Sequence, residues 1–432
     1  MAASGEAMKP AKGAARPPLS PGSRRAIAFV TVISLLNSIA AMLIIPVLPK
    51  LVEGFTHDTS HAAQWVGVFA VAFALIQFLA SPVLGALSDA YGRRTVILIS
   101  AFGMAADYLF MALAPSIGWL LVGRSIAGLT AASNPAINAY IADSIPPEER
   151  AGVFGWTGAA MSIGFLLGPS LGGFLGVVSP RLPFWASAGL GVMVALYGLL
   201  ILPESLPKDR RTPFSFKRAH PLASIGFLAE RPQVLGLVVV LMTMMVAAQC
   251  LPNTLVLYTE HRFGWSTAAA GLYLTYAGLG HLTVQSLVVK RYVGRFGERT
   301  AAVTGYLSTA VGFLIFAATP VGVLFPVGTP FYALAGMVGP AVQSQMTRMV
   351  APNEQGRLQG AVAGLSSLAG MVAVLAFTQI FAFASAKGHE AVPQGLHLYV
   401  AAAVLLTGAA LAWRNMSART PGLGAVPAPR PG

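Results

Sequence analysis

Gly85-Ala-Leu-Ser-Asp89-Ala-Tyr-Gly92-Arg93-Arg94 is a polar stretch between two apolar runs, residues 65–84 and 95–113. Gly85 and Gly92 permit tight turns and close approach of helices, because glycine has no Cβ. Asp89 can accept hydrogen bonds from a helix N-terminus or pair with Arg93 or Arg94. Basic residues alone would mark only the side of a membrane on which a loop lies. The acid and the two glycines indicate a packed loop with a structural role.

The two flanking runs belong to a series that fills the chain. Of its 432 residues, 55% are apolar and only 10% are charged, against about 25% charged residues in a soluble domain. A helix needs about 20 apolar residues to cross a bilayer. Twelve runs of about that length lie at 26–48, 65–84, 95–113, 118–141, 153–178, 184–202, 233–257, 267–290, 300–318, 320–342, 360–385 and 394–414. We predict an all-α integral membrane protein of twelve transmembrane helices.

The net charge of +13 is explained by the loops between these runs. Sorting Lys and Arg by loop places 23 on the side of the termini and four on the other side, Lys50, Arg181, Arg262 and Lys387. Because cytoplasmic loops carry the excess of basic residues, both termini are expected in the cytoplasm. We expect a protein of the plasma membrane, which in a bacterium is the inner membrane. We expect no nucleic-acid partner. A single cysteine, Cys250, offers no intramolecular disulfide and no basis for a metal cluster.

The chain divides into two halves of six spans each. Residues 1–25 form a polar tail, 26–202 the N-terminal half, 203–232 a basic, proline-punctuated linker, 233–414 the C-terminal half, and 415–432 a second tail. The run 26–48 is too long for a signal-peptide core and is expected to be an uncleaved anchor. Tyr-Gly-Arg-Arg-Thr at 91–95 and Phe-Gly-Glu-Arg-Thr at 296–300 precede the third span of each half, 205 residues apart, and Pro115 and Pro320 keep this offset.

This arrangement resembles the major facilitator superfamily, in which two six-helix halves bind substrate between them near the midplane. The stretch Gly85–Arg94 is similar to its loop signature at every defining position. The fifth span is similar to the glycine and proline signature of its drug antiporters at Gly155, Gly164, Gly168, Pro169, Gly172 and Gly173. Ordinary packing of small residues between helices is the alternative interpretation of these positions.

Two charged residues lie deep within spans, Asp107 in the third and Arg124 in the fourth. A charge in hydrocarbon costs about 2.5–3.5 kcal/mol on insertion scales, so each needs a partner or a wet cavity. Both lie about 9 Å from the same membrane surface, six residues at 1.5 Å each. Arg124 followed by Gly128 resembles a superfamily motif linked to proton transfer. A proton-coupling site and a purely structural ion pair both remain open.

The region 26–414 resembles the bacterial tetracycline efflux proteins, which exchange a metal–tetracycline complex for protons. The resemblance is carried by Ile45-Pro-Val-Leu-Pro49, Ala106-Asp107-Tyr108-Leu109, Thr259-Glu260-His261-Arg262-Phe263-Gly264-Trp265 and Gly356-Arg357-Leu358-Gln359-Gly360. It implies a transport role for Asp107 and for His281 and Gln285, although a lone membrane histidine is as often structural. The family's other membrane acids are replaced here by Asn37 and, in the ninth span, by Thr309 or its neighbours, which weighs against tetracycline itself.

We therefore expect a proton-driven exporter of small drug-like molecules, with the proton gradient as energy source and no cofactor. Asp107, Arg124 and His281 are the candidates for proton coupling. Polar side chains at span depth usually face the interior of a bundle, and the predicted cavity residues are Asn37, Gln77, Asn134, Asn138, Gln249, Asn253, His281 and Gln285. An importer or facilitator of a metabolite would use the same fold. No metal-ligand cluster, nucleophile triad or phosphate-binding loop is evident, so we expect a transporter that works as a monomer and not an enzyme.

Overall fold

The computed structural model describes residues 21–131, 134–145, 147–212, 228, 231–350, 355–386, 388–389 and 391–416. The N-terminal half consists of α1 (Pro21–Leu43), α2 (Leu48–Thr56), α3 (Thr59–Tyr91), α4 (Arg93–Leu113), α5 (Ile117–Ala131), α6 (Asn134–Ser144), α7 (Pro147–Val178) and α8 (Leu182–Ile201). A 3-10 turn, η1 (Lys208–Arg210), follows in the connection between the halves.

The C-terminal half repeats the scheme. Its helices are α10 (Pro232–Ala248), α11 (Cys250–Phe263), α12 (Thr267–Thr283), the π-helix η3 (Val284–Val288), α13 (Val289–Phe296), α14 (Glu298–Ala318), the 3-10 helix η4 (Gly322–Gly328), α15 (Thr329–Ala333), the 3-10 helix η5 (Leu334–Met337), α16 (Val338–Arg348), α17 (Gln355–Ser385) and α18 (Leu396–Asn415). Helices suit this chain because every backbone donor and acceptor in hydrocarbon must be paired within its own segment.

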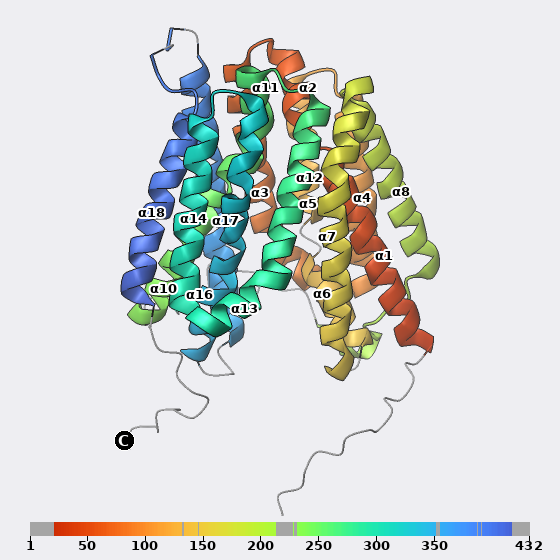
Figure 1. Cartoon of the computed structure of the whole chain (residues 1–432). Coiled ribbons are helices and arrows are strands. Elements are labelled where there is room, and N and C mark those ends of the chain that lie inside the picture. The colour runs from red at the N-terminus through yellow and green to blue at the C-terminus, as the bar shows by residue number, and fades with distance from the viewer. Residues whose placement is uncertain are drawn as a thin grey trace, which may run out of the picture.

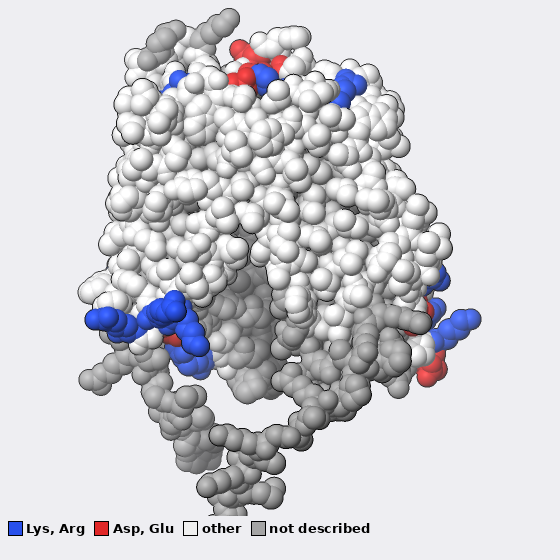
Figure 2. All heavy atoms as spheres, turned by 45° about the vertical axis from the view of Figure 1, so that its right-hand side comes forward, with Lys and Arg blue, Asp and Glu red and all other residues white. Residues whose placement is uncertain are grey.

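Ten helical segments of the described chain are long and apolar enough to cross a membrane. The two other predicted spans are divided. Residues 118–141 form α5 and α6, and 267–290 form α12, η3 and the start of α13. Helix α1 begins and α18 ends at the same face of the molecule, at the bottom of Figure 1. Figure 2 shows Lys and Arg at this terminal face and fewer at the opposite, distal face, with an uncharged belt between them.

Several spans differ from their predicted limits. Helix α3 runs well beyond the predicted 65–84, because Asp58 caps its first turn by accepting a hydrogen bond from the His61 amide and the helix continues past the apolar run. The predicted spans 26–48 and 233–257 each lie within one candidate membrane span, but each contains an interruption that hydropathy does not predict. Each is broken, between α1 and α2 and between α10 and α11, close to Pro46 and Pro252. Proline removes a backbone donor and crowds the preceding turn.

The 205-residue repeat recurs in the backbone. Helices α4 and α14 both have 21 residues, and each is preceded by a glycine with positive φ, Gly92 at 103° and Gly297 at 80°. This backbone region strongly favours glycine. At the distal ends, Arg181 donates to the Ala114 carbonyl at 2.9 Å and Arg262 to that of Thr319 at 2.9 Å. Two of the four basic residues predicted on this side therefore hold helix C-termini.

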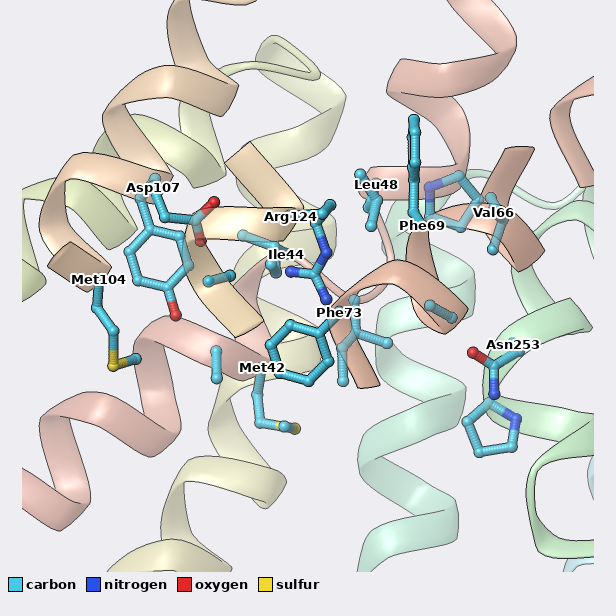
Figure 3. Close-up of a pocket in the computed structure, with 17 residues that line it drawn as sticks. Met42, Ile44, Leu48, Val66, Phe69, Phe73, Met104, Asp107, Arg124 and Asn253 are labelled. Carbon is cyan, nitrogen blue, oxygen red and sulfur yellow. The ribbon is translucent and has the colours of Figure 1, made fainter. Parts of the chain in front are cut away.

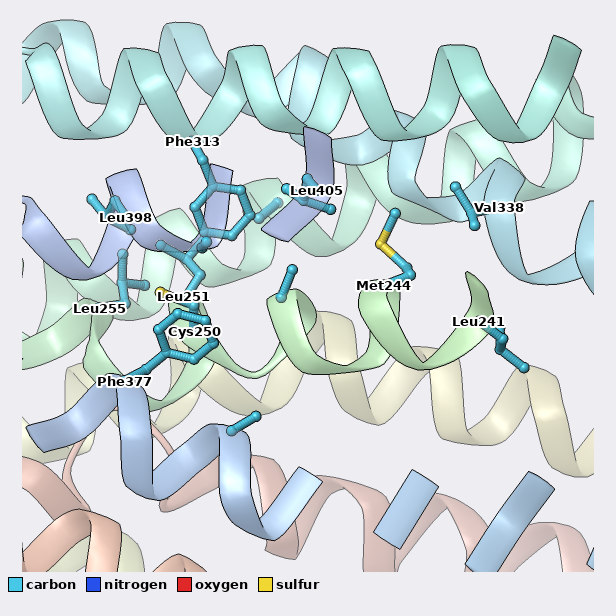
Figure 4. Close-up of a cluster of buried hydrophobic side chains, with 14 of the residues drawn as sticks. Leu241, Met244, Cys250, Leu251, Leu255, Phe313, Val338, Phe377, Leu398 and Leu405 are labelled. Atoms are coloured by element: carbon cyan, nitrogen blue, oxygen red, sulfur yellow. The ribbon is translucent and has the colours of Figure 1, made fainter. Parts of the chain in front are cut away.

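The largest buried cluster includes the core of the C-terminal half. Figure 4 shows its centre, where Leu241 and Met244 of α10 and Cys250, Leu251 and Leu255 of α11 face Phe313, Phe377, Leu398 and Leu405. Cys250 is fully buried and forms no disulfide, and its thiol donates to the His397 carbonyl at 3.5 Å. This packing holds the two pieces of the broken span, α10 and α11, in one rigid wall.

The two halves meet mainly near the distal face. Ser60 Oγ donates to the Ala382 carbonyl at 2.8 Å, and Thr275 Oγ1 donates to that of Leu166 at 2.8 Å. Lys50 of α2 pairs with Glu260 of α11 across the interface. These contacts close the distal face between the two halves.

Candidate transport site

The breaks in the first span of each half meet at one cavity. The turn between α1 and α2 contributes Ile44 and Ile45, and α11 contributes Pro252 and Asn253 just after the break at Gln249. The cavity has a volume of about 300 Å³. Broken helices near the midplane, where backbone groups lose their helical partners, are a common way to build a transport site. Figure 3 shows this cavity and the residues around it.

Asp107 of α4 and Arg124 of α5 line this cavity together. The Asp107 side chain is only 1% exposed. The two side chains interact electrostatically but do not form a direct ion pair, and Asp107 Oδ1 and Arg124 Nε have no hydrogen-bond partner among the described residues. Their shared depth left a contact between them open, and the two side chains do line one cavity. A permanent salt bridge between them is not the described arrangement.

Two glycines of α5 make this geometry possible. A Cβ on Gly123 would lie 3.2 Å from Asp107 Oδ1, so the glycine leaves room for the carboxylate. A Cβ on Gly128 would lie 2.7 Å from the Phe73 carbonyl, so the glycine lets α3 approach α5. The Phe73 ring lies below the Arg124 guanidinium, with 4.6 Å between Cζ and the ring centroid. This cation–π contact orients the arginine without consuming its hydrogen-bond donors.

His281 and Gln285 line a second pocket, of about 430 Å³, between α7 and the C-terminal half. The His281 ring lies against Gly336, where a Cβ would come within 3.2 Å of Cε1. Gln285 lies in the π-helix η3, a local widening that is frequent at functional sites. Thus His281 and Gln285 lie together, as their spacing predicts, but they do not line the cavity of Asp107 and Arg124.

The other predicted cavity residues are dispersed. Asn253 lines the main cavity, and its Nδ2 donates to the Gln249 carbonyl at 2.8 Å. Gln249 lies at the break between α10 and α11. Its Nε2 packs against Gly370 of α17, where an added Cβ would lie 2.9 Å away. Asn37 lines a small separate space between α1, α4, α6 and α8. Gln77 lies on α3 and is not among the residues lining either cavity. The side chains of Asn134 and Asn138 lie outside the described residues.

The loop signature at the terminal face is a network of charges. Arg93 pairs with Asp89 and, through Nε, with Asp143 Oδ2 at 3.1 Å. The N-terminus of α4 is capped by Glu204, whose carboxylate accepts from the Arg93 amide at 2.9 Å. Arg94 donates to the Leu199 carbonyl at 2.8 Å. A side chain on Gly92 would collide with Glu204. The loop thus ties α3, α4, α6 and the connection after α8 together, while Gly85 lies within α3.

Sequence reasoning missed Asp143 and Glu204. Asp143 closes the network from the end of α6. Of the two roles open to Asp89, it takes the pairing with Arg93, and Glu204 supplies the helix cap. The only signal for Glu204 was its place directly after the sixth span. The C-terminal half has a matching ion pair between Glu298, at the start of α14, and Arg348, at the end of α16.

The glycines of α7 are contact points between helices. A Cβ on Gly164, Gly168 or Gly172 would collide with Ser38, Met42 or Leu43 of α1. A Cβ on Gly173 would lie 2.5 Å from the Thr267 carbonyl of α12, in the other half. Pro169 lies within the continuous helix α7, and its carbonyl faces Gly271 of α12. Gly155 lies in α7 nearer the terminal face. One helix therefore packs closely on both its own half and the partner half.

Two helix bundles that enclose a cavity at the breaks of their first helices, with charged residues at span depth, define a membrane transporter. The family model of the Major Facilitator Superfamily matches residues 30–374. The chain belongs to this superfamily and, within it, to the group of the tetracycline resistance proteins.

Relatives and solved structures agree with this assignment. The chain is 37% identical to the tetracycline resistance protein, class C, of Escherichia coli, over 80% of this chain and 87% of that protein. It is 27% identical to multidrug resistance protein 2 of Bacillus subtilis (strain 168), over 75% of this chain and 80% of that protein. The structure of the human organic anion transporter TETRAN is similar with a TM-score of 0.65 and 25% identity, covering 91% of this chain and all of that one.

Proposed function

We propose that this protein is a proton-driven exporter of small, partly apolar drug-like molecules that works by alternating access between its two halves. The observation that carries the proposal is the buried carboxylate of Asp107 in the cavity where the two broken helices meet, because its Oδ1 has no hydrogen-bond partner among the described residues. A buried acid favours its neutral form, and a nearby arginine favours the charged form. A movement that changes their separation changes the proton affinity of Asp107, which is the physical requirement for exchanging protons against substrate.

The names of the relatives support drugs as substrates, because they include tetracycline and multidrug resistance proteins. The absence of carboxylates at Asn37 and Thr309 leaves tetracycline itself as one candidate among several. We propose that one chain suffices for transport, because helices of a single chain enclose the cavity. Neither a cofactor nor a nucleic-acid partner has a role in this mechanism.

The direct test is a transport assay with the purified protein in proteoliposomes. With an imposed pH gradient, the proposal expects uphill movement of a fluorescent drug against protons, abolished by an uncoupler. Substrate movement down its own gradient without proton movement would identify a facilitator instead. A drug-susceptibility panel in a pump-deficient bacterial host tests direction, because an exporter lowers drug accumulation and an importer raises it.

Export also requires a defined orientation, with the terminal face in the cytoplasm of a bacterial inner membrane. In a Cys250→Ser background, Asp209→Cys in η1 should resist an impermeant thiol reagent applied to intact cells. His61→Cys is the matched position near the distal face, where the His61 side chain is 67% exposed, and it should be labelled. Labelling of Asp209→Cys from outside would overturn the orientation.

A further inference from the structure

The two halves differ in charge at their terminal ends. The ion pair between Arg93 and Asp143 in the N-terminal half has a counterpart in the other half at the offset of 205 residues. This counterpart joins Glu298 and Arg348, so the same contact recurs with its charges exchanged. Both halves therefore keep this structural pair. The difference lies in the short helix just before Glu298, α13.

Three basic residues, Lys290, Arg291 and Arg295, lie on α13. At the same offset the N-terminal half has small residues in their places, Gly85, Ala86 and Ala90. The acid of the loop signature, Asp89, corresponds to Gly294. A general excess of Lys and Arg marks the side of the membrane, but it does not require three of them on one short helix. The repeated architecture therefore does not explain them.

The three basic side chains share one exposed face of α13. At about 100° per residue, positions 290, 291 and 295 fall within about 140° of one another around the helix. All three side chains are exposed. The other side of the helix is fixed, because Tyr292 packs against the largest buried cluster and its hydroxyl is hydrogen-bonded to Thr304 of α14 at 3.0 Å. The basic face is thereby held outward.

These charges are not neutralised within the part of the chain that the structure describes. The one described acid at the terminal end of the C-terminal half is Glu298, and it already pairs with Arg348. Arg291 donates to the Leu287 carbonyl of its own helical segment at 2.9 Å, which leaves its charge in place. Figure 2 shows Lys and Arg gathered at this end, at the lower left. Because like charges close together repel, an anion that binds among them also relieves this repulsion.

Neighbouring side chains place the basic face at the border of the membrane. Leu287, one turn before the basic residues, is 53% exposed, as suits a side chain in contact with lipid. Trp413, at the end of α18, is 59% exposed, and the Arg299 Cζ of α14 lies 3.8 Å from its ring centroid. Tryptophan is enriched at the level of the lipid headgroups. Arg299 follows Arg295 by four residues, so the end of α13 lies at this level.

We propose that the basic face of α13 binds the headgroup of an anionic phospholipid in the leaflet at the terminal face. Lys290 and Arg291 donate charge-assisted hydrogen bonds to its phosphate, and Leu287 contacts the start of its acyl chains. Each Lys or Arg beside an anionic membrane surface strengthens binding by about fivefold. The proposal concerns how the protein contacts its membrane, and it stands independently of what the protein transports.

Native mass spectrometry of the purified full-length protein tests this binding. The protein is released from detergent micelles that contain either dioleoyl phosphatidylglycerol or dioleoyl phosphatidylcholine. The two lipids have the same chains, but only the first carries a net negative charge. We expect phosphatidylglycerol to stay bound at several-fold lower concentrations than phosphatidylcholine. Retention of both lipids at the same concentrations would overturn the proposal.

Variants locate the site on α13. Arg291→Gln should lower the affinity for phosphatidylglycerol about fivefold. Arg291→Lys keeps the charge and should keep most of the affinity, which separates loss of charge from damage to the helix. The matched control is Lys208→Gln in η1, an exposed position in the connection between the halves. It removes the same charge as Arg291→Gln and should leave the affinity unchanged. Equal losses in Arg291→Gln and Lys208→Gln would contradict the assignment to α13.

A soluble phosphate is the other source of the same chemistry. Glycerol 3-phosphate offers a phosphate group without acyl chains. At equal ionic strength it should displace bound phosphatidylglycerol no better than sodium chloride, because the chains keep the lipid headgroup beside α13. Displacement by glycerol 3-phosphate where sodium chloride has no effect would assign the face to a soluble phosphate compound and overturn the assignment to lipid.

Discussion

Gly123 determines how Asp107 sits in the cavity. Its missing side chain is the reason that the carboxylate fits against α5, because a methyl group added at this position would fall 3.2 Å from Oδ1 and 3.0 Å from Met111 Cγ. Both contacts are tighter than ordinary packing, so the neighbours must shift to admit a methyl group. The helix itself would gain, because alanine is the better helix former by about 1 kcal/mol. A methyl group at this position should therefore impair transport without lowering the stability of the protein.

Gly123→Ala is expected to lower proton-driven transport about fivefold to tenfold with normal amounts of protein in the membrane, as a small displacement at a site can do. Gly118→Ala on the same helix is the matched control, because a Cβ there lies 3.9 Å from its nearest neighbour, Ser116 Oγ. Uphill uptake into inverted membrane vesicles measures both variants. Equal transport by the two would show that the position of the Asp107 carboxylate is not critical.

The residues that sequence reasoning found and missed differ in one physical respect. Asp107 and Arg124 could be found because a charge within an apolar run is conspicuous in any sequence. Glu204 and Asp143 could not, because the Arg93 groups that they contact lie 111 and 50 residues away. Asn37 has the right residue type and depth, yet it faces a separate space. Hydropathy gives the depth of a side chain, but only the packing of helices decides which way it points.

Among the helices, α1 and α7 form the closest pair in the N-terminal half. A Cβ on Gly172 would overlap the Leu43 carbonyl, and backbone cannot move aside as a side chain can. Gly172→Ala should therefore force α1 and α7 apart and lower the free energy of unfolding by about 3 kcal/mol or more. The amount of folded protein in the membrane should fall accordingly. Gly158→Ala in the same helix is the control, since nothing lies within 4 Å of a Cβ there. Thermal unfolding in detergent, followed by fluorescence-detected size exclusion, compares the two variants. Similar melting temperatures would contradict this packing role.

The ion pair between α2 and α11 joins the outer pieces of both broken spans. Lys50 contacts Glu53 at 3.1 Å in its own half and Glu260 in the other half. Both partners of the bridge are partly exposed, at 38% and 28%. An exposed ion pair contributes only about 0–1 kcal/mol. Its loss is therefore expected to shift the balance between the two open states and not to unfold the protein.

Lys50→Glu places three carboxylates together and should open the distal face several-fold more often. Thr267→Cys in a Cys250→Ser background reports this opening, because Thr267 Oγ1 donates to the Gly173 carbonyl across the interface at 3.3 Å. An impermeant thiol reagent should label that cysteine faster in Lys50→Glu than in Lys50→Gln. Adding Glu260→Lys to Lys50→Glu should restore slow labelling. Unchanged labelling in all variants would mean that other contacts close this face.

The helix breaks show where hydropathy fails at the level of elements. The runs 26–48 and 233–257 are apolar throughout, so a hydropathy average predicts one continuous helix for each. Pro46 and Pro252 were the available signal, and together they mark the cavity. Hydropathy also did not predict the long extension of α3 or the 3-10 turns around Pro326. The reason is the same, because backbone geometry depends on single residues that an average conceals.

At the scale of the whole molecule, twelve spans and the resemblance between halves could be predicted because they depend on length, apolarity and repeated motifs. The conformation could not. Closure of the distal face depends on Ser60, Thr275 and Lys50 meeting partners in the other half, at separations of 322, 109 and 210 residues. No local pattern encodes such contacts. Alternating access requires that these contacts break while new ones form between the halves at the terminal face.

The proposed proton coupling links that movement to Asp107, the acid that lines the cavity. In a one-proton exchange, a pH difference of one unit supplies about 1.4 kcal/mol and sustains about a tenfold substrate gradient.

Asp107→Asn removes the titrating group and keeps its shape. If Asp107 carries the proton, the variant should still exchange substrate down its gradient, yet the uphill gradient should collapse to about equal concentrations. If the carboxylate instead only stabilises Arg124, the variant should lose expression or thermal stability, and Arg124→Gln in the same chain should restore part of it. Proteoliposomes with an imposed pH difference distinguish these results. Uphill transport by Asp107→Asn with its normal dependence on the gradient would place the proton elsewhere, and His281, in the second pocket, would then be the next residue to replace.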